Sequence, residues 1–194
     1  SYFIVTCRPG TTSAGPDLLL AGTTMINFRL EGANESDLIH NLVHKSFGQE
    51  AEAVLVKNLC ADGDALISLV AVDDEDNSIV GHILFSDTPV GTTKNLLRGA
   101  AMAPLSVSET HQGQGIGGGL VIQGLRECRD SGIQVVLVLG DPNYYGRFGF
   151  SADIAKDLDT PYKGEFFQAL EIEPGILNGV SGKVLYPNAF SKLA

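Results

Sequence analysis

The chain has 194 residues, of which 44% are hydrophobic and 19% are charged, and its formal net charge is -10. This is the composition of an ordinary soluble globular protein, and the length suits one domain with a modest extension. The acidic balance argues against a nucleic-acid-binding protein, which would carry a basic surface, and no apolar run approaches the roughly 20 residues that span a bilayer.

Residues 1–25 are small and polar, with several Gly and Pro around one apolar patch at residues 18–21. They lack the charged start and the long apolar core of a secretory signal. We therefore interpret residues 1–25 as an N-terminal extension of unclear role, followed by a single domain over residues 26–194.

Three cysteines are spread over the chain without a C-x-x-C pair: Cys7, Cys60 and Cys128. An odd number at wide spacing predicts neither a disulfide framework nor a zinc site, and a reducing cytoplasm is the simplest location. The histidines have no ligand-like partners either, so no metal is expected. Because Cys128 falls at a core-facing position of a predicted helix, we expect it to be a packing residue.

A short strand and two helices are predicted first. Residues 25–30 form the strand, and Asn34 precedes a Glu-Ser-Asp sequence, which is typical of an N-cap followed by acids in the first helical turn. Apolar residues then recur at helical spacing until Gly48, which ends the helix. A second helix is expected from Ala51 to about Asp62.

The middle of the chain predicts antiparallel strands. Residues 65–72 and 79–85 are apolar and partly β-branched, and the acidic turn 73–77 between them indicates a hairpin. Residues 86–98 are interpreted as a long polar loop, and residues 100–107 as the next strand of the sheet.

A strand–helix–strand unit follows. Beyond Gly115 an apolar stripe predicts a helix that ends at Gly132, and the nearly uninterrupted apolar run 133–139 is typical of a central strand. Such a unit forms a right-handed parallel crossover. With two further strands near residues 166–172 and 183–186, the order of elements predicts an α/β fold with a mixed sheet.

The start of this helix holds a run of glycines. Five of them fall within seven positions, although each Gly in a helical turn costs about 1 kcal/mol relative to Ala. We infer that a ligand approaches the backbone closely here, and a phosphate at the N-terminus of a helix is the commonest such ligand. The five residues are Gly113, Gly115, Gly117, Gly118 and Gly119.

Residues 113–118 satisfy the pattern G-x-G-x-x-G, and Asp141 follows the next strand, near where a ribose-binding acid would lie. A dinucleotide-binding fold, however, normally begins with this unit and repeats it. Here the unit comes after the predicted hairpin, and five residues separate the end of the apolar strand from the first glycine. An NAD-binding protein of the Rossmann type is therefore the less favoured alternative.

The same stretch contains the pattern Q-x-x-G-x-G at residues 112–117, and the later residues 144–150 are YYGRFGF. These two motifs resemble the acyl-CoA-binding loop and the FY-x-x-x-GF segment of the GCN5-related N-acetyltransferases (the GNAT family), within which the chain resembles the YhbS-like group. It departs from the family pattern at Tyr144, where Phe is usual, and at Glu109, where Pro is usual. Two motifs in the correct order are more specific than either alone.

The resemblance implies an acyl-CoA N-acyltransferase fold, in which helices flank a central mixed sheet and two central strands splay apart. It also implies an acyltransferase that uses acetyl-CoA as cosubstrate. The pyrophosphate would lie at the start of the glycine-bearing helix, whose backbone N–H groups suit an anion, and the pantetheine arm would lie between the splayed strands. The residues expected to contact acetyl-CoA are Leu105, Val107, Gln112, Gly113, Gln114, Gly115, Ile116, Gly117, Gly118, Asn143 and Tyr145.

The resemblance further implies the chemistry. The N–H of Val107 would polarise the thioester carbonyl, and an amine would attack it directly. Tyr145, whose phenol stays protonated at neutral pH, would protonate the departing CoA thiolate. Glu109 is the candidate general base, with Asp141 and His111 as weaker candidates.

The acceptor is expected to be a primary amine of a small molecule or a peptide, since the acidic composition favours a cationic partner over a nucleic acid. Homodimerisation is a tendency of the family. An acyl-CoA-binding or regulatory module without efficient turnover stays open as an alternative, because a fold does not determine a function.

Overall fold

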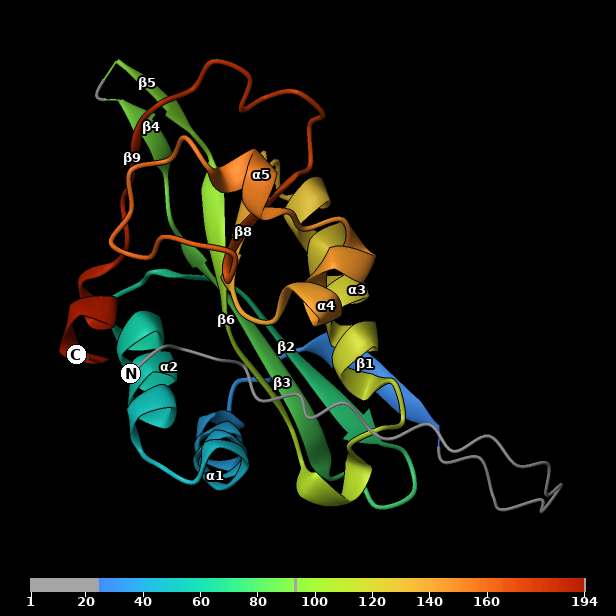
Figure 1. Ribbon diagram of the computed structural model, residues 1–194. Helices are drawn as coiled ribbons and strands as arrows, with labels where there is room; N and C mark the ends of the chain where they lie inside the picture. Colours follow the sequence, from blue (N-terminus) through green and yellow to red (C-terminus); the bar gives the residue numbers. More distant parts are fainter. Residues whose placement is uncertain (1–24, 93, 194) are drawn as a thin grey trace, which may run out of the picture.

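The computed structural model describes residues 25–92 and 94–193, and Figure 1 shows their arrangement. The strands are β1 (Ile26–Leu30), β2 (Ala65–Asp73), β3 (Ile79–Asp87), β4 (Val90–Thr92), β5 (Asn95–Leu97), β6 (Gly99–Val107), β7 (Val135–Leu139), β8 (Phe167–Glu171) and β9 (Lys183–Val184). The helices are α1 (Ser36–Phe47), α2 (Ala51–Ala61), α3 (Ile116–Asp130), α4 (Pro142–Tyr145) and α5 (Ala152–Ala155), with 3-10 turns at Glu109–His111, Gly146–Phe148 and Asn188–Leu193.

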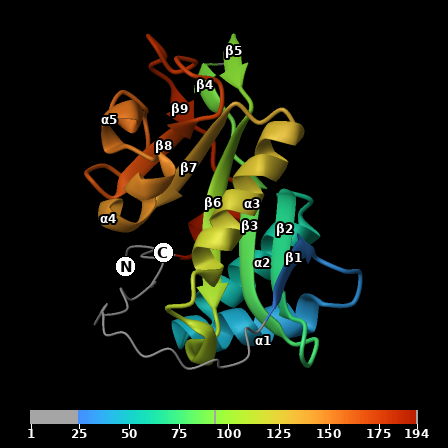
Figure 2. The same ribbon diagram turned by 90° about the vertical axis from the view of Figure 1, so that its right-hand side faces the viewer.

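Six strands form the central sheet in the order β1-β2-β3-β6-β7-β8, and β5, β4 and β9 form a smaller sheet. Neighbouring strands of the central sheet are antiparallel, except that β6 and β7 are parallel. This confirms the predicted mixed sheet and the parallel crossover through α3. Helix α3 covers one face of the sheet, and α1 and α2 cover the other (Figures 1 and 2).

Each face of the sheet has its own apolar cluster. On one face Leu120 of α3 packs in a cluster with Phe85 of β3, and on the other face Val43 of α1 packs in a cluster with Leu84 of β3. Side chains alternate along a strand, so these neighbouring residues of β3 point to opposite faces. Burial of one such side chain stabilises the fold by roughly 1.5–3 kcal/mol. Strand β3 therefore stabilises the packing of both helical layers.

Strands β6 and β7 separate after a short paired stretch. They are paired only where Gly99, Ala100 and Ala101 face the three residues 135–137. Strand β6 then continues to Val107 with β3 as its only partner among the described strands, and Gly81 lies opposite Val107. The second half of β6 therefore has one edge open toward β7, which is the splay that the family resemblance implied.

Two local predictions are wrong. Residues 86–98 are not a loop, because β3 extends to Asp87 and the segment then forms the hairpin of β4 and β5. Strand β4 takes a second partner in β9, more than 90 residues later in the chain, which no local pattern reveals. Asn34 is not the N-cap of α1, since Glu35 occupies that position and its carboxylate accepts bonds from Arg29 and from the N–H of Gly32.

The predicted extension lies outside the described residues, apart from Met25. Within the described part of the chain, no helix is long and apolar enough to cross a membrane.

Candidate active site

The glycine turn places the start of α3 in a conformation that only glycine adopts easily. Gly113 and Gly115 have φ values of 77° and 82°, which L-residues with a Cβ rarely accept. Gly115 is the N-cap of α3, and within residues 25–92 and 94–193 no side chain caps the helix there. The first backbone bond of the helix runs from the N–H of Gly119 to the carbonyl of Gly115. The N–H groups of residues 116–118 therefore point out of the helix start, where an anion is stabilised by donors and by the helix dipole.

The remaining glycines of the run make room for protein side chains. A Cβ on Gly119 would lie 2.3 Å from the ring of Phe28, and a Cβ on Gly117 would lie 2.8 Å from the hydroxyl of Tyr144. A Cβ on Gly118 would meet its nearest atom, in Phe148, at an ordinary 3.6 Å. The prediction that a ligand explains all five glycines is therefore too simple, because Gly119 serves the packing of α3 on β1.

The open edge of β6 presents main-chain N–H groups. The N–H of Ser108 donates to the carbonyl of Val80 across the β3 side. Because main-chain direction alternates along an antiparallel strand, the N–H groups of Val107 and Leu105 point to the opposite edge, toward the parted β7. The carbonyl of Val107 accepts from the side chains of Gln112 and Ser46, at 3.1 and 3.4 Å. One amide hydrogen of the motif glutamine thus ties the glycine turn to the strand end.

The aromatic segment follows β7 and is held by a capped turn. Asp141 caps α4 by accepting from the N–H of Asn143 at 2.8 Å and from its side-chain amide at 3.1 Å. The ring of Tyr145 is 1% exposed, packs edge-on against Phe150 and lies against Gly140, where a Cβ would fall 2.4 Å from the ring. The predicted acid is therefore a buried and rigidly oriented phenol at the end of β7.

A cation that the sequence analysis missed lies at the start of α3. The guanidinium of Arg147 stacks over the ring of Tyr144, 4.1 Å from its centroid, and over Phe148, at 4.8 Å. Its Nη2 atom is 3.7 Å from the point where a Cβ of Gly118 would lie. Arg147 occupies one of the variable positions of the Y-x-x-x-G-F motif, so motif matching alone could not single it out.

The candidate general base lies in a turn beyond the end of β6. Glu109 belongs to the 3-10 turn that follows Ser108, and its side chain is exposed. In the same turn His111 Nδ1 is 2.7 Å from the hydroxyl of Ser108, and its Nε2 is 3.5 Å from a carboxylate oxygen of Asp73. Of the two weaker candidates, His111 is thus engaged in holding the turn, and Asp141 is engaged in capping α4.

Comparisons with known proteins agree with this geometry. Residues 27–152 match the family model described as the acetyltransferase (GNAT) domain. The chain belongs to the GNAT acetyltransferase family. It is 38% identical over 166 residues to the uncharacterised N-acetyltransferase YhbS of Escherichia coli K12, which covers 84% of this chain and 98% of YhbS. It is 33% identical over 123 residues to YjhQ of the same organism, which covers 63% of this chain and 68% of YjhQ.

Two crystal structures resemble this GNAT acetyltransferase over most of its length. Escherichia coli YhbS in complex with CoA superposes with a TM-score of 0.80 at 36% identity, covering 88% of this chain and 94% of YhbS. A GNAT acetyltransferase from Brucella melitensis in complex with acetyl-CoA gives a TM-score of 0.71 at 29% identity, covering 87% and 99%. The dinucleotide-binding alternative is therefore wrong, as the single parallel pair among the described strands also indicates.

The far side of the parted strands has an aromatic lining. A hollow of about 30 Å³ lies between β6 and β7 and is closed by Tyr162, Tyr186 and Phe190. The ring of Tyr186 is 5.5 Å from that of Tyr162 and 5.4 Å from that of Phe190. These rings come from the C-terminal third of the acetyltransferase, where the sequence offered the weakest signal.

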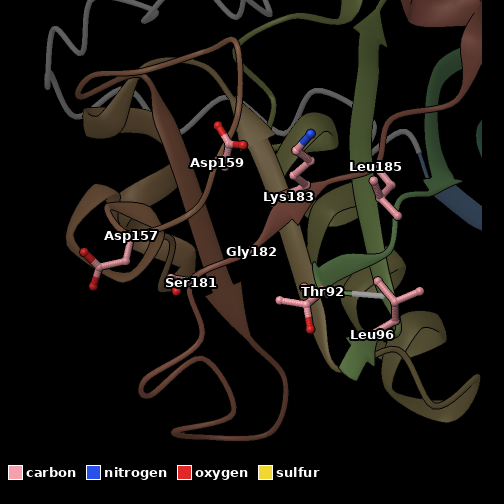
Figure 3. Close-up of a pocket in the computed structure, with 9 residues that line it drawn as sticks. Thr92, Leu96, Asp157, Asp159, Ser181, Gly182, Lys183 and Leu185 are labelled. Carbon is pink, nitrogen blue, oxygen red and sulfur yellow. The ribbon is translucent and has the colours of Figure 1, made fainter. Parts of the chain in front are cut away.

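A larger hollow of about 520 Å³ lies at the other end of the sheet, between the β4–β5 hairpin and the segment of Asp157 and Asp159 (Figure 3). It contains none of the motif residues. Among the described residues of the acetyltransferase, no group of three or more His, Cys, Asp or Glu side chains is placed to hold a metal ion. Cys128 is buried, and burial raises its pKa to about 12, in keeping with a packing role.

Proposed function

We propose that this GNAT acetyltransferase transfers the acetyl group of acetyl-CoA to a primary amine by direct attack. The observation that carries the proposal is the uncapped start of α3 beside the open edge of β6. An anion site and a row of strand donors lie next to each other there, as a pyrophosphate with an amide-containing arm requires. The two similar structures that contain CoA and acetyl-CoA support the same ligand.

The pyrophosphate would be bound by the turn. Its donors are the backbone N–H groups from Gly113 to Gly118, including those of Gln114 and Ile116, since the N–H of Gln112 donates to the carbonyl of Glu109. The guanidinium of Arg147 adds a positive charge at the same helix start, where charge-assisted bonds are the strong ones. Asn143 is exposed on α4, and its side chain is proposed to contact the pyrophosphate from the side opposite the turn.

The pantetheine arm would extend along the open edge of β6 as an added strand. Leu105 and Val107 present their N–H groups to that edge, since the β3 side uses the alternate residues. We assign to Val107 the N–H that polarises the thioester carbonyl, a donor that strengthens as the oxyanion forms. Leu105 is the second donor on the edge and binds a carbonyl of the arm.

Tyr145 would protonate the departing CoA thiolate. A phenol has an ordinary pKa of about 10, so it is protonated at neutral pH and can donate. The contacts with Phe150 and Gly140 fix its ring, which holds the donor in one direction. Glu109 is retained as the proposed general base, reached through water from its exposed turn.

A CoA-release screen tests the proposal. Purified protein is mixed with acetyl-CoA and, separately, spermidine, L-lysine, 2-phenylethylamine and a tripeptide with a free N-terminus, and the free thiol is followed. We expect thiol release with at least one amine, and thermal stabilisation by acetyl-CoA but not by NAD. Binding of acetyl-CoA without turnover of any amine class would favour the binding-module alternative.

A further inference from the structure

A line of hydrogen bonds enters the sheet from the α1 and α2 side. The hydroxyl of Ser68 on β2 donates to Oε2 of Glu31 at 2.6 Å, and the same hydroxyl oxygen is 3.0 Å from Nε2 of His82 on β3. His82 has no solvent exposure. It lies between residues of β3 that face α3, so its side chain points to the opposite face, as that of Leu84 does. A buried histidine on a carboxylate-linked hydroxyl is an unusual element of a sheet interior.

The bond pattern determines which nitrogen of His82 carries the hydrogen. A serine hydroxyl has one hydrogen, and that of Ser68 is donated to Glu31. The Ser68 oxygen must therefore accept from Nε2–H of His82, which leaves Nδ1 with a lone pair directed into the protein. Burial lowers the pKa of His82 to about 3, so the ring is neutral at physiological pH.

The bare Nδ1 has a second unsatisfied group beside it. Ser106 of β6 lies directly opposite His82 in the antiparallel register and is 2% exposed. Cβ atoms of residues opposed in this way are about 4.5–5.5 Å apart on one face of the sheet. Neither Nδ1 of His82 nor Oγ of Ser106 has a hydrogen-bond partner among the described residues. A buried acceptor and a buried hydroxyl on opposed residues, neither of them satisfied, point to a partner that arrives during function.

The two ends of this line lie in informative places. At the inner end, Ser106 directly precedes Val107, whose N–H faces the open edge of β6. At the outer end, Glu31 lines a groove of about 560 Å³ between α1 and α2. Polar groups thus lead from the edge proposed to hold the thioester to the protein surface.

We propose that Ser106, His82, Ser68 and Glu31 form a proton exit path for acetyl transfer, an inference that rests on the proposed function. Conversion of an ammonium group and acetyl-CoA to an amide and CoA thiol releases one net proton. The nitrogen loses two protons in all, and Glu109 takes one of them through water. The other leaves as the amine N–H bond breaks and Ser106 Oγ takes it, while the Ser106 hydrogen moves to Nδ1 of His82. The Nε2 hydrogen moves to Ser68, and the Ser68 hydrogen moves to Glu31, which releases it to water. A turn of the Ser106 hydroxyl toward Nδ1 when the amine binds completes the path.

His82 does not touch the substrate in this scheme and acts through Ser106. The ring of His82 is neutral in its resting form, because burial lowers its pKa. It can gain a proton on Nδ1 as it loses one from Nε2, and it is then neutral again. The thiolate receives a separate proton from Tyr145, which regains one from water, so one net proton is released per turnover.

The tautomer is measured first, on the full chain without any acceptor. Long-range ¹⁵N–¹H correlation spectra of labelled protein distinguish the two neutral forms, and variants that remove His40, His44 and His111 one at a time assign the signals. We expect Nε2–H for His82, with loss of this preference in Ser68→Ala. A hydrogen on Nδ1, or a charged ring at neutral pH, would overturn the path.

Kinetics then test the path with the panel amine that gives the fastest CoA release. Ser106→Ala is expected to lower kcat at least about tenfold, within what general acid–base groups contribute, and to leave KM for acetyl-CoA unchanged. Its melting temperature is expected to be equal or higher, because the removed hydroxyl is buried without a partner. Ser106→Thr retains a hydroxyl and is expected to restore most of the rate, which a merely structural role would not produce.

Glu31→Gln provides the matched surface test. It keeps an oxygen for the Ser68 hydrogen bond but takes up no proton, so kcat should fall about tenfold. The control is Glu173→Gln, an exposed glutamate that accepts from the side-chain amide of Gln134, and it should keep the wild-type rate. Wild-type kcat in Ser106→Ala and Glu31→Gln would overturn the path. If no amine gives CoA release in the wild type, the proposed function fails, and the tautomer measurement alone decides the arrangement at His82.

Discussion

The glycine turn (residues 112–118) and the aromatic segment (residues 144–150) meet at the start of α3. The turn contributes main-chain groups to the candidate site, whereas the aromatic segment contributes side chains. The turn presents main-chain N–H groups, and its positive φ values at Gly113 and Gly115 aim them outward. The aromatic segment presents side chains, with Tyr145 buried at the end of β7 and Arg147 stacked over Tyr144.

This difference determines how each region responds to mutation. A substitution in the turn acts through backbone conformation or through collision with a neighbour, since no side-chain donor is lost with a glycine. A substitution in the aromatic segment removes a specific atom while the backbone stays in place. We therefore expect changes in the aromatic segment to affect catalysis and binding, and changes in the glycine run to affect stability as well.

The largest effect is expected for Tyr145→Phe. Loss of the hydroxyl removes the proposed acid while the buried ring keeps its packing, so kcat should fall roughly 100-fold. Affinity for acetyl-CoA should stay within about twofold, as measured by calorimetry beside the CoA-release assay. Tyr144→Phe is the matched control and should keep a rate near that of the wild type. Equal rates in wild type and Tyr145→Phe would remove the acid assignment.

At two adjacent positions of the glycine run, substitution by Ala should change the free energy of unfolding in opposite directions. Gly119→Ala places a Cβ 2.3 Å from the ring of Phe28, and we expect the free energy of unfolding to fall by about 1–3 kcal/mol in spite of the better helix propensity. Gly118→Ala meets only an ordinary contact and should raise that free energy by up to about 1 kcal/mol.

Urea denaturation measures both glycine variants, and acetyl-CoA titration of Gly118→Ala adds the functional side. A weaker affinity in a protein that is equally or more stable would locate the pyrophosphate at this amide. Unchanged affinity would instead indicate that the pyrophosphate contacts the amides of Gly113 and Gln114.

Arg147→Gln is expected to weaken acetyl-CoA binding about tenfold, which corresponds to about 1.4 kcal/mol. The reason is the loss of a cation next to the free amides of α3. Calorimetry at low and high salt measures it, and the difference between wild type and variant should shrink as salt rises. A constant difference at both salt concentrations would indicate lost packing on Tyr144 and Phe148 rather than lost charge.

The smallest effect is expected at Glu35, outside both motifs. Its hydrogen bonds with Arg29 lower its pKa to about 2, against about 4.3 in an unfolded chain. This stabilisation is complete above the unfolded pKa and is lost as the pH falls toward the folded pKa. Glu35→Gln should therefore lower the free energy of unfolding by about 1 kcal/mol at pH 7, and by less at about pH 3, in urea titrations. A difference that does not change with pH would refute the ionic cause.

Much of the fold was predictable because its signals are local. The hairpin of β2 and β3, the helix after Gly115 and the apolar strand β7 each have a period or a run of their own, and all three are confirmed. The hairpin of β4 and β5 was missed because its pairing with β9 depends on residues far away in the chain. The cap of α1 was misassigned because Arg29, on strand β1, holds Glu35 in place.

The residues of the candidate site fall into the same two groups, those with a local signal in the sequence and those without one. The turn and the tyrosine were predicted from two motifs, which are patterns of short segments of the sequence. Arg147 was not identified, because its role depends on stacking over Tyr144 and on its distance from Gly118. Ser106 and His82 were not identified either, because a serine and a histidine on separate strands become neighbours only through the register of β3 with β6.

The sequence by itself determined the family and most of the order of elements. It did so because glycine conformations, apolar periodicity and motif spacing are properties of short segments. Only the tertiary structure decided where β6 leaves β7, which of the five glycines face side chains, and which polar groups are buried without a partner. These depend on contacts between residues distant in the chain, and such contacts form only when the sheet and its two helical layers pack together.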